Sequence, residues 1–153
     1  MLNIFDRYRK VRMYLSDAVH DLTTEQFNFV PPGFNNNIIW NVGHLITAQQ
    51  GVCYARAGKP LVIDDVMFKN YKPGTRPGAF VDSIEIDHFK SLSLSTIDQF
   101  EKDYLIGHFS AYTPWTTRYG VELADINTAT EFLFYHEGLH MGYIAALKKC
   151  MRK

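Results

Sequence analysis

The chain has 153 residues, which suits one domain with one hydrophobic core, and we treat residues 1–153 as a single unit. Hydrophobic residues make up 46% of the sequence and charged residues 21%, proportions that exclude a disordered chain. Basic and acidic residues balance at 16 each, so we expect no nucleic-acid partner. No apolar run approaches the roughly 18 residues that span a bilayer, so we expect no membrane partner.

The first predicted helix covers about Asn3 to Asp21, because apolar residues recur there at steps of three and four. Four basic residues interrupt the apolar positions and are expected on the solvent-facing side of this helix: Arg7, Arg9, Lys10 and Arg12. A break follows over residues 23–36, which contain Pro31-Pro32-Gly33.

The second predicted helix covers about Asn37 to Ala57 and stops at Gly58 and Pro60. It is apolar on nearly every side, which places it in the middle of a bundle. A connection of unusual length, residues 59–87, follows it. This connection is either a lid over a pocket or an inert packed loop, and the sequence does not choose between the two.

Two further helices are predicted, one from about His88 to Ile106 and one from about Ala129 to Lys149. The segment Tyr112 to Val121 between them suits a short extended pair. Thr128 and Glu131 have the spacing of a capping box at the start of the last helix. Four helices with little strand signal predict an all-α fold, a four-helix bundle with a long loop between helices two and three.

Two features bear on the compartment of the protein. Cys53 and Cys150 make no disulfide framework, which favours a reducing environment. The charges at Asp6 and Arg7 interrupt the start of the chain, so we expect no secretory signal. Both features favour a cytoplasmic location.

His136 and His140 lie one turn apart in the last predicted helix, pointing about 40° from each other. Helical projection places them in a stripe with Leu133 and Leu147, so both rings face the core. Each buried neutral ring has a donor and an acceptor that need partners. One metal ion would satisfy a nitrogen of each ring, so the pair predicts a metal site.

Catalytic zinc sites usually have three protein ligands and an open position, so a third ligand is needed. His44 lies inside the apolar second helix, and small residues follow it at helical steps: Ala48, Gly51 and Ala55. Small side chains let a neighbouring helix come close, so His44 is the predicted third ligand. The alternative is a core histidine bonded to a backbone carbonyl.

The last helix also contains His136-Glu137-x-x-His140, the pattern of zinc peptidases, in which Glu137 would be the general base. Those enzymes take their third ligand downstream, and no residue after His140 is His, Asp or Glu. We therefore expect Glu137 to bond or orient a neighbouring group or to face solvent, and a catalytic role is the alternative.

These features together resemble the DinB-like family, which is related to the bacillithiol- and mycothiol-dependent enzymes. The resemblance covers nearly the whole chain and rests on three segments: Pro31-Pro32-Gly33, Trp40-x-x-Gly43-His44-Leu45 and His136-x-x-x-His140-x-Gly142. It implies a bundle of up-down-down-up order and a three-histidine site for zinc or nickel, with His44, His136 and His140 as the ligands.

The chain departs from this family at Tyr143, where members commonly have glutamine. Tyr143 falls in the histidine stripe, one turn beyond His140. Its hydroxyl would then reach a substrate or a metal-held water, which is a catalytic role, or its ring would narrow the pocket as an aromatic plug.

The leading functional hypothesis is a divalent-metal-dependent enzyme that acts on a small-molecule substrate. It would be either a hydrolase or a transferase that uses a low-molecular-weight thiol as cofactor, and the resemblance favours the thiol route slightly. The rival is a non-catalytic metal-binding or stress-response module, which predicts a fourth protein ligand and no adjoining pocket. A metal-free helical protein is a third alternative, and a homodimer is left open as a partner state.

Overall fold

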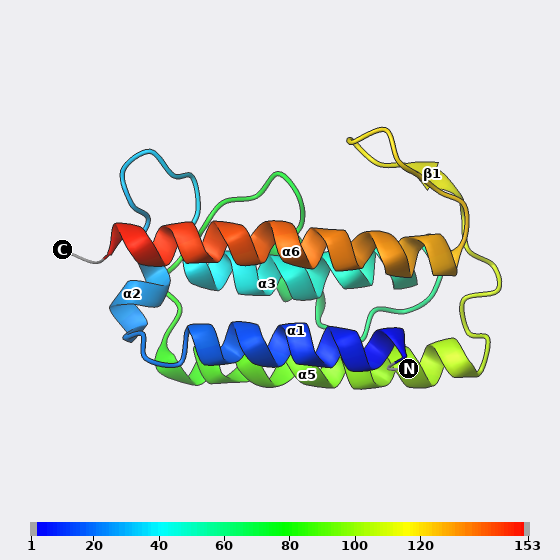
Figure 1. Cartoon of the computed structure of the whole chain (residues 1–153), viewed down its shortest axis with the longest axis horizontal. Coiled ribbons are helices and arrows are strands. Elements are labelled where there is room, and N and C mark those ends of the chain that lie inside the picture. The colour runs from blue at the N-terminus through cyan, green and yellow to red at the C-terminus, as the bar shows by residue number, and fades with distance from the viewer. Residues whose placement is uncertain (1–2, 152–153) are drawn as a thin grey trace.

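Four long helices lie lengthwise against one another in the structure, a computed structural model that describes residues 3–151 (Figure 1). They are α1 (Ile4–Ala18), α3 (Ile38–Gln49), α5 (Ser83–Leu105) and α6 (Ile126–Cys150). α1 and α3 each pack against both α5 and α6. The chain colours in Figure 1 show α1 and α6 running in one direction and α3 and α5 in the other. The predicted all-α fold is confirmed.

α1 begins where the sequence predicts but carries a buried charge on its inner face. The side chain of Asn3 caps the first turn by accepting a hydrogen bond from the backbone N–H of Asp6. Tyr8 and Leu15 are buried, and Arg12, between them, is only 1% exposed. The predicted position of Arg12 on the solvent-facing side is therefore wrong, because its helical spacing from Tyr8 turns it inward.

α3 continues directly into a π-helical turn, η1 (Gln50–Tyr54), and a 3-10 turn, η2 (Ala55–Ala57). Gly58 ends the run with φ of 65°, a left-handed conformation that favours glycine. Every residue of α3 is buried, as predicted for a central helix. π-helical turns are frequent at functional sites, and this one follows the helix that carries His44.

The connections around α3 contain more helix than predicted. α2 (Thr24–Asn28) lies in the expected break before it. α4 (Asp65–Tyr71) lies in the long connection after it and packs against α3. α5 then begins at Ser83, earlier than the predicted His88, because Asp82 caps its first turn. The predicted long loop is therefore shorter and partly helical.

A small antiparallel hairpin precedes α6, with strands β1 (Trp115–Thr116) and β2 (Glu122–Leu123). In Figure 1 it rises near the start of α6 and lies above the first part of this helix. α6 begins at Ile126 rather than at the predicted Ala129. The capping box that starts it pairs Asp125 with Thr128, so the predicted pairing of Thr128 with Glu131 is wrong.

Buried side chains form two hydrophobic clusters along the bundle. One includes Leu15, Ile46, Phe89 and Leu147, and the other includes Phe5, Cys53, Phe100 and Leu133. On each long helix a buried polar or charged side chain falls between the two clusters: Arg12, Gln49, Ser93 and Glu137. None of the helices within residues 3–151 is long and apolar enough to cross a membrane.

Candidate metal centre

The three predicted ligands meet in the interior, where α3 faces α6. One side-chain nitrogen from each of His44, His136 and His140 lies within 4.8 Å of the corresponding nitrogens of the other two. The ring centroids are 5.2 Å apart for His44 and His136, 4.8 Å for His44 and His140, and 4.6 Å for His136 and His140. Side chains separated by about ninety residues of chain are thus brought to one point.

The orientation of His44 is fixed from two sides. Its Nδ1 lies 2.7 Å from the backbone carbonyl oxygen of Tyr71, which can only accept a hydrogen bond. Nδ1 therefore carries the proton, and Nε2 keeps a free lone pair for a metal. The ring also stacks on Trp40, with centroids 4.8 Å apart and planes inclined by 7°. The backbone-carbonyl bond that the alternative predicted is thus present, and it is compatible with metal binding because it leaves Nε2 free.

The contact between Tyr71 and His44 depends on Gly43. A Cβ atom placed on Gly43 would lie 2.6 Å from Cδ1 of the Tyr71 ring, far inside van der Waals distance. Glycine at this position lets α4 approach α3 closely enough for the Tyr71 carbonyl to reach the imidazole. Gly43 and His44 therefore act together, because the glycine makes room for the Tyr71 contact that orients the histidine.

His140 is oriented by a side chain that the sequence analysis missed. Its Nδ1 lies 2.8 Å from Oδ1 of Asn41, which is fully buried. The amide nitrogen of Asn41 donates in turn to the backbone carbonyl of Asn37, at 2.7 Å. Because the Asn41 nitrogen donates to this carbonyl, its oxygen Oδ1 must be the atom that faces His140. Oδ1 accepts the proton of Nδ1, so His140 also keeps Nε2 free. Asn41 lies three residues before His44, on the same side of the helix, and this spacing could have identified it as a neighbour of the site.

All three imidazoles are held neutral by their surroundings. Burial, which disfavours the charged ring, is the main cause that lowers the pKa of His44, and the charge of Arg118 adds to it. Burial also lowers the pKa of His136 and of His140 to about 3, and repulsion from neighbouring histidines and from Arg118 adds to the effect. Neutral imidazole is the form that binds a metal, so the cluster needs to release no protons near pH 7.

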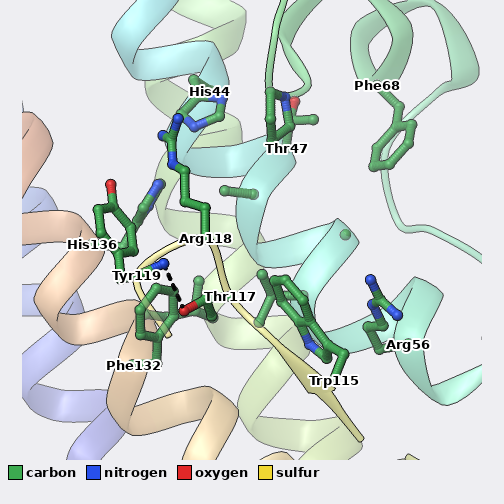
Figure 2. A pocket seen from close by; sticks show the side chains of 15 residues that line it. His44, Thr47, Arg56, Phe68, Trp115, Thr117, Arg118, Tyr119, Phe132 and His136 are labelled. Atoms are coloured by element: carbon green, nitrogen blue, oxygen red, sulfur yellow. Dashed lines mark hydrogen bonds between the residues drawn. The ribbon is translucent and has the colours of Figure 1, made fainter. Parts of the chain in front are cut away.

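A cavity of about 360 Å³ adjoins the cluster, with His44 and His136 in its wall (Figure 2). The hairpin supplies one side through Trp115, Thr117, Arg118 and Tyr119, and α6 supplies Phe132 and Leu133. Phe68 and Pro73, from the long connection, line another side. That connection thus contributes to the pocket wall and also supplies the carbonyl that orients His44, whereas the hairpin was not expected to take part.

Glu137 is only 2% exposed and forms a buried ion pair with Arg12, so it does not face solvent. Its Oε2 accepts a bond of 2.7 Å from Nε of Arg12, and its Oε1 accepts from Nη2. Arg12 also donates to the backbone carbonyl of Leu45, the residue after His44, and to that of Ser93. One guanidinium therefore links all four long helices next to both ligand-bearing segments, which agrees with an orienting role for Glu137.

Tyr143 lies outside the lining of this cavity. Its ring packs edge-on against Phe34, with centroids 5.5 Å apart, and the residue is 36% exposed. The other three histidines, His20, His88 and His108, are absent from the cluster.

The donor set suits one divalent transition metal. Neutral imidazoles bind zinc and nickel, and three of them leave at least one coordination position open. Within residues 3–151 the cluster contains no fourth histidine, cysteine or carboxylate. The paired Nδ1 atoms of His44 and His140, with Nε2 left free on each ring, are the arrangement that a resident metal requires.

Comparison with known proteins identifies the family of the chain. No match to a curated protein was found. Residues 7–144 match the sequence pattern of the DinB superfamily, a stretch that covers α1 through most of α6 and contains all three histidines. The chain therefore belongs to the DinB superfamily.

Proposed function

We propose that this protein is a divalent-metal-dependent enzyme that acts on a small molecule through His44, His136 and His140. The observation that carries the proposal is that the three-histidine cluster opens onto a cavity, with two of the histidines in its wall. The volume of about 360 Å³ falls within the range of small-molecule sites, about 300–1,000 Å³.

A bound zinc or nickel ion would supply Lewis acidity toward a water molecule or a thiol. The chain supplies the remaining functions. Tyr71 and Asn41 hold the ligand rings in the required tautomer. Phe68, Phe132 and Leu133 give the adjoining space an apolar wall.

Two reactions fit this chemistry, hydrolysis and transfer of a low-molecular-weight thiol to an electrophile. The resemblance to thiol-dependent enzymes favours the thiol route slightly, and the apolar cavity wall suits an electrophile with a hydrophobic body. Glu137 acts here as a positioning residue, since Arg12 engages both of its oxygens. Tyr143 packs against Phe34 outside the lining of this cavity, so the proposal assigns it neither contact with the substrate nor narrowing of the pocket.

The rival proposal is a non-catalytic metal-binding or stress-response module. It predicts a fourth protein ligand and no pocket, whereas the cluster has three members within residues 3–151 and a cavity beside it. A homodimer stays a prediction that sedimentation analysis would test.

The test is an activity assay on protein loaded with zinc or with nickel. We expect turnover of an electrophile such as 1-chloro-2,4-dinitrobenzene with a low-molecular-weight thiol, or turnover of p-nitrophenyl esters. His136→Ala should abolish either activity while retaining the helical circular dichroism of the parent. An absence of turnover in both assays with one metal per chain would favour the non-catalytic module.

A further inference from the structure

The charged side chains in the cavity wall all carry positive charge. Among the residues that line it, two are arginines, Arg56 and Arg118, and none is aspartate or glutamate. A divalent metal held by three neutral imidazoles would add further positive charge at one end of the same space. Positive charge of this kind in a largely apolar wall attracts an anionic ligand.

Arg118 is the arginine placed to bind that anion. It extends from the hairpin toward His44 (Figure 2), and its charge contributes to the lowered pKa of all three histidines. Within residues 3–151 it makes no ion pair and no side-chain hydrogen bond, although its guanidinium carbon lies 5.3 Å from the centre of the Tyr119 ring. Its donors are therefore free to bind a ligand.

Arg56 differs in its surroundings. Its guanidinium lies 4.4 Å from the centre of the Trp115 ring, so its charge is already in contact with an indole. Figure 2 places Arg56 at the end of the cavity away from His44. Arg118 is therefore the arginine with free donors on the side of the cavity near His44.

A second polar group lies beside the cluster without a partner. Thr47, one turn after His44, lines the cavity and is 1% exposed, and its hydroxyl oxygen has no hydrogen-bond partner among the described residues. A buried hydroxyl without a hydrogen-bond partner destabilises the folded state. A ligand in the cavity would supply the missing partner.

We propose that the cavity binds a small carboxylate with an apolar body, the carboxylate accepting hydrogen bonds from Arg118 and Thr47 next to the histidine cluster. A guanidinium binds a carboxylate through two parallel N–H···O bonds, and one guanidinium suffices for a single negative charge. The apolar body then lies against Phe132, Leu133 and Val52. The inference rests on the proposed function and names its substrate class.

The experiment compares 3-phenylpropionate with its neutral counterpart, 3-phenylpropanamide. Isothermal titration calorimetry measures both Kd values on the full chain, metal-free and loaded with one zinc. We expect the carboxylate to bind at least about tenfold more tightly than the amide in both forms. Arg118→Gln should abolish this preference, and Arg7→Gln, at an exposed arginine of α1 outside the cavity, should retain it.

Thr47→Val gives a second readout that a purely structural residue would not show. The variant removes an unpaired buried hydroxyl, so the melting temperature of the ligand-free protein should stay equal or rise. Carboxylate affinity should fall about threefold to tenfold in the same variant. A loss of stability with unchanged affinity would contradict the role of Thr47.

The outcomes separate this inference from the proposed function. Equal affinity for acid and amide, an Arg118→Gln variant that behaves as the parent, or no binding of either probe up to about 10 mM would overturn the inference. Metal binding and turnover would be unaffected by those results. An Arg118-dependent preference in a protein that binds no metal would support the carboxylate site and contradict the metalloenzyme.

Discussion

At the scale of single residues, the site depends on side chains that hold the ligands as well as on the ligands themselves. Tyr71 engages His44 and Asn41 engages His140, and each contact leaves one imidazole nitrogen free. Such supporting contacts fix the tautomer and the ring direction, and their loss typically lowers metal affinity tenfold to a hundredfold, as an order of magnitude.

Asn41→Ala should therefore weaken zinc binding by about tenfold or more, because His140 loses the acceptor of its Nδ1 proton. Competition with a chromogenic chelator measures the Kd. Asn35→Ala, which changes an exposed asparagine nearby, is the control and should bind zinc as the parent does. Equal affinity in both variants would exclude the orienting role of Asn41.

Substitutions at Arg12 and Glu137, the buried ion pair, should have strongly non-additive effects on the free energy of unfolding. Arg12→Met alone leaves a carboxylate buried without its partner and should lower the free energy of unfolding by about 3–5 kcal/mol. Adding Glu137→Leu removes the isolated charge and should restore most of that loss. Urea denaturation of the two single variants and the double variant measures the coupling, and purely additive effects would contradict it.

At the scale of elements, the distance between α3 and α4 is set by two glycine-dependent features. Gly43 permits the ring of Tyr71 to lie against the backbone of α3. Gly58 ends the run of helical turns, after which the chain turns back and α4 packs against α3. The position of α4 thus decides whether the Tyr71 carbonyl reaches His44.

Gly43→Ala should lower both stability and zinc affinity, because its Cβ displaces the Tyr71 ring. We expect a stability loss of about 1–3 kcal/mol, typical of overpacking. Gly138→Ala is the matched control, since a Cβ there meets nothing within 4 Å and the helix should gain about 0.5–1 kcal/mol. Thermal denaturation and zinc titration measure both effects, and similar behaviour of the two variants would refute the packing argument.

The elements also show what the sequence reveals and what it does not. Apolar periodicity predicted the four long helices, and projection of α6 predicted the inward histidine pair, because both depend only on local spacing. The first residues of α5 and α6 were misplaced, because Asp82 and Asp125 cap these helices earlier in the chain than predicted. The roles of Arg12, Asn41 and Arg118 depend on contacts between distant segments, which composition and spacing do not encode.

At the scale of the whole molecule, apolar side chains form most of the buried interior of the bundle. The two hydrophobic clusters lie on either side of the layer that contains Arg12 and Glu137, and they bury many apolar side chains from all four long helices. Burial of this apolar surface is the main source of stability, so the fold should not require the metal.

Removal of the metal with a chelator should therefore leave the far-UV circular dichroism unchanged at 25 °C. The melting temperature should fall, because a ligand that binds only the folded state stabilises it. A collapse of the helical signal on chelation would show that the metal is structural and that the clusters cannot maintain the bundle.

The most direct measurement of the central claim is the metal content of protein purified without chelator or affinity tag, together with its three single histidine variants. Elemental analysis should find one zinc or nickel per chain in the parent. His44→Ala, His136→Ala and His140→Ala should each lose the metal while keeping helical circular dichroism. A metal-free parent, or a His44→Ala variant that retains the full metal content, would contradict a site built from these three imidazoles.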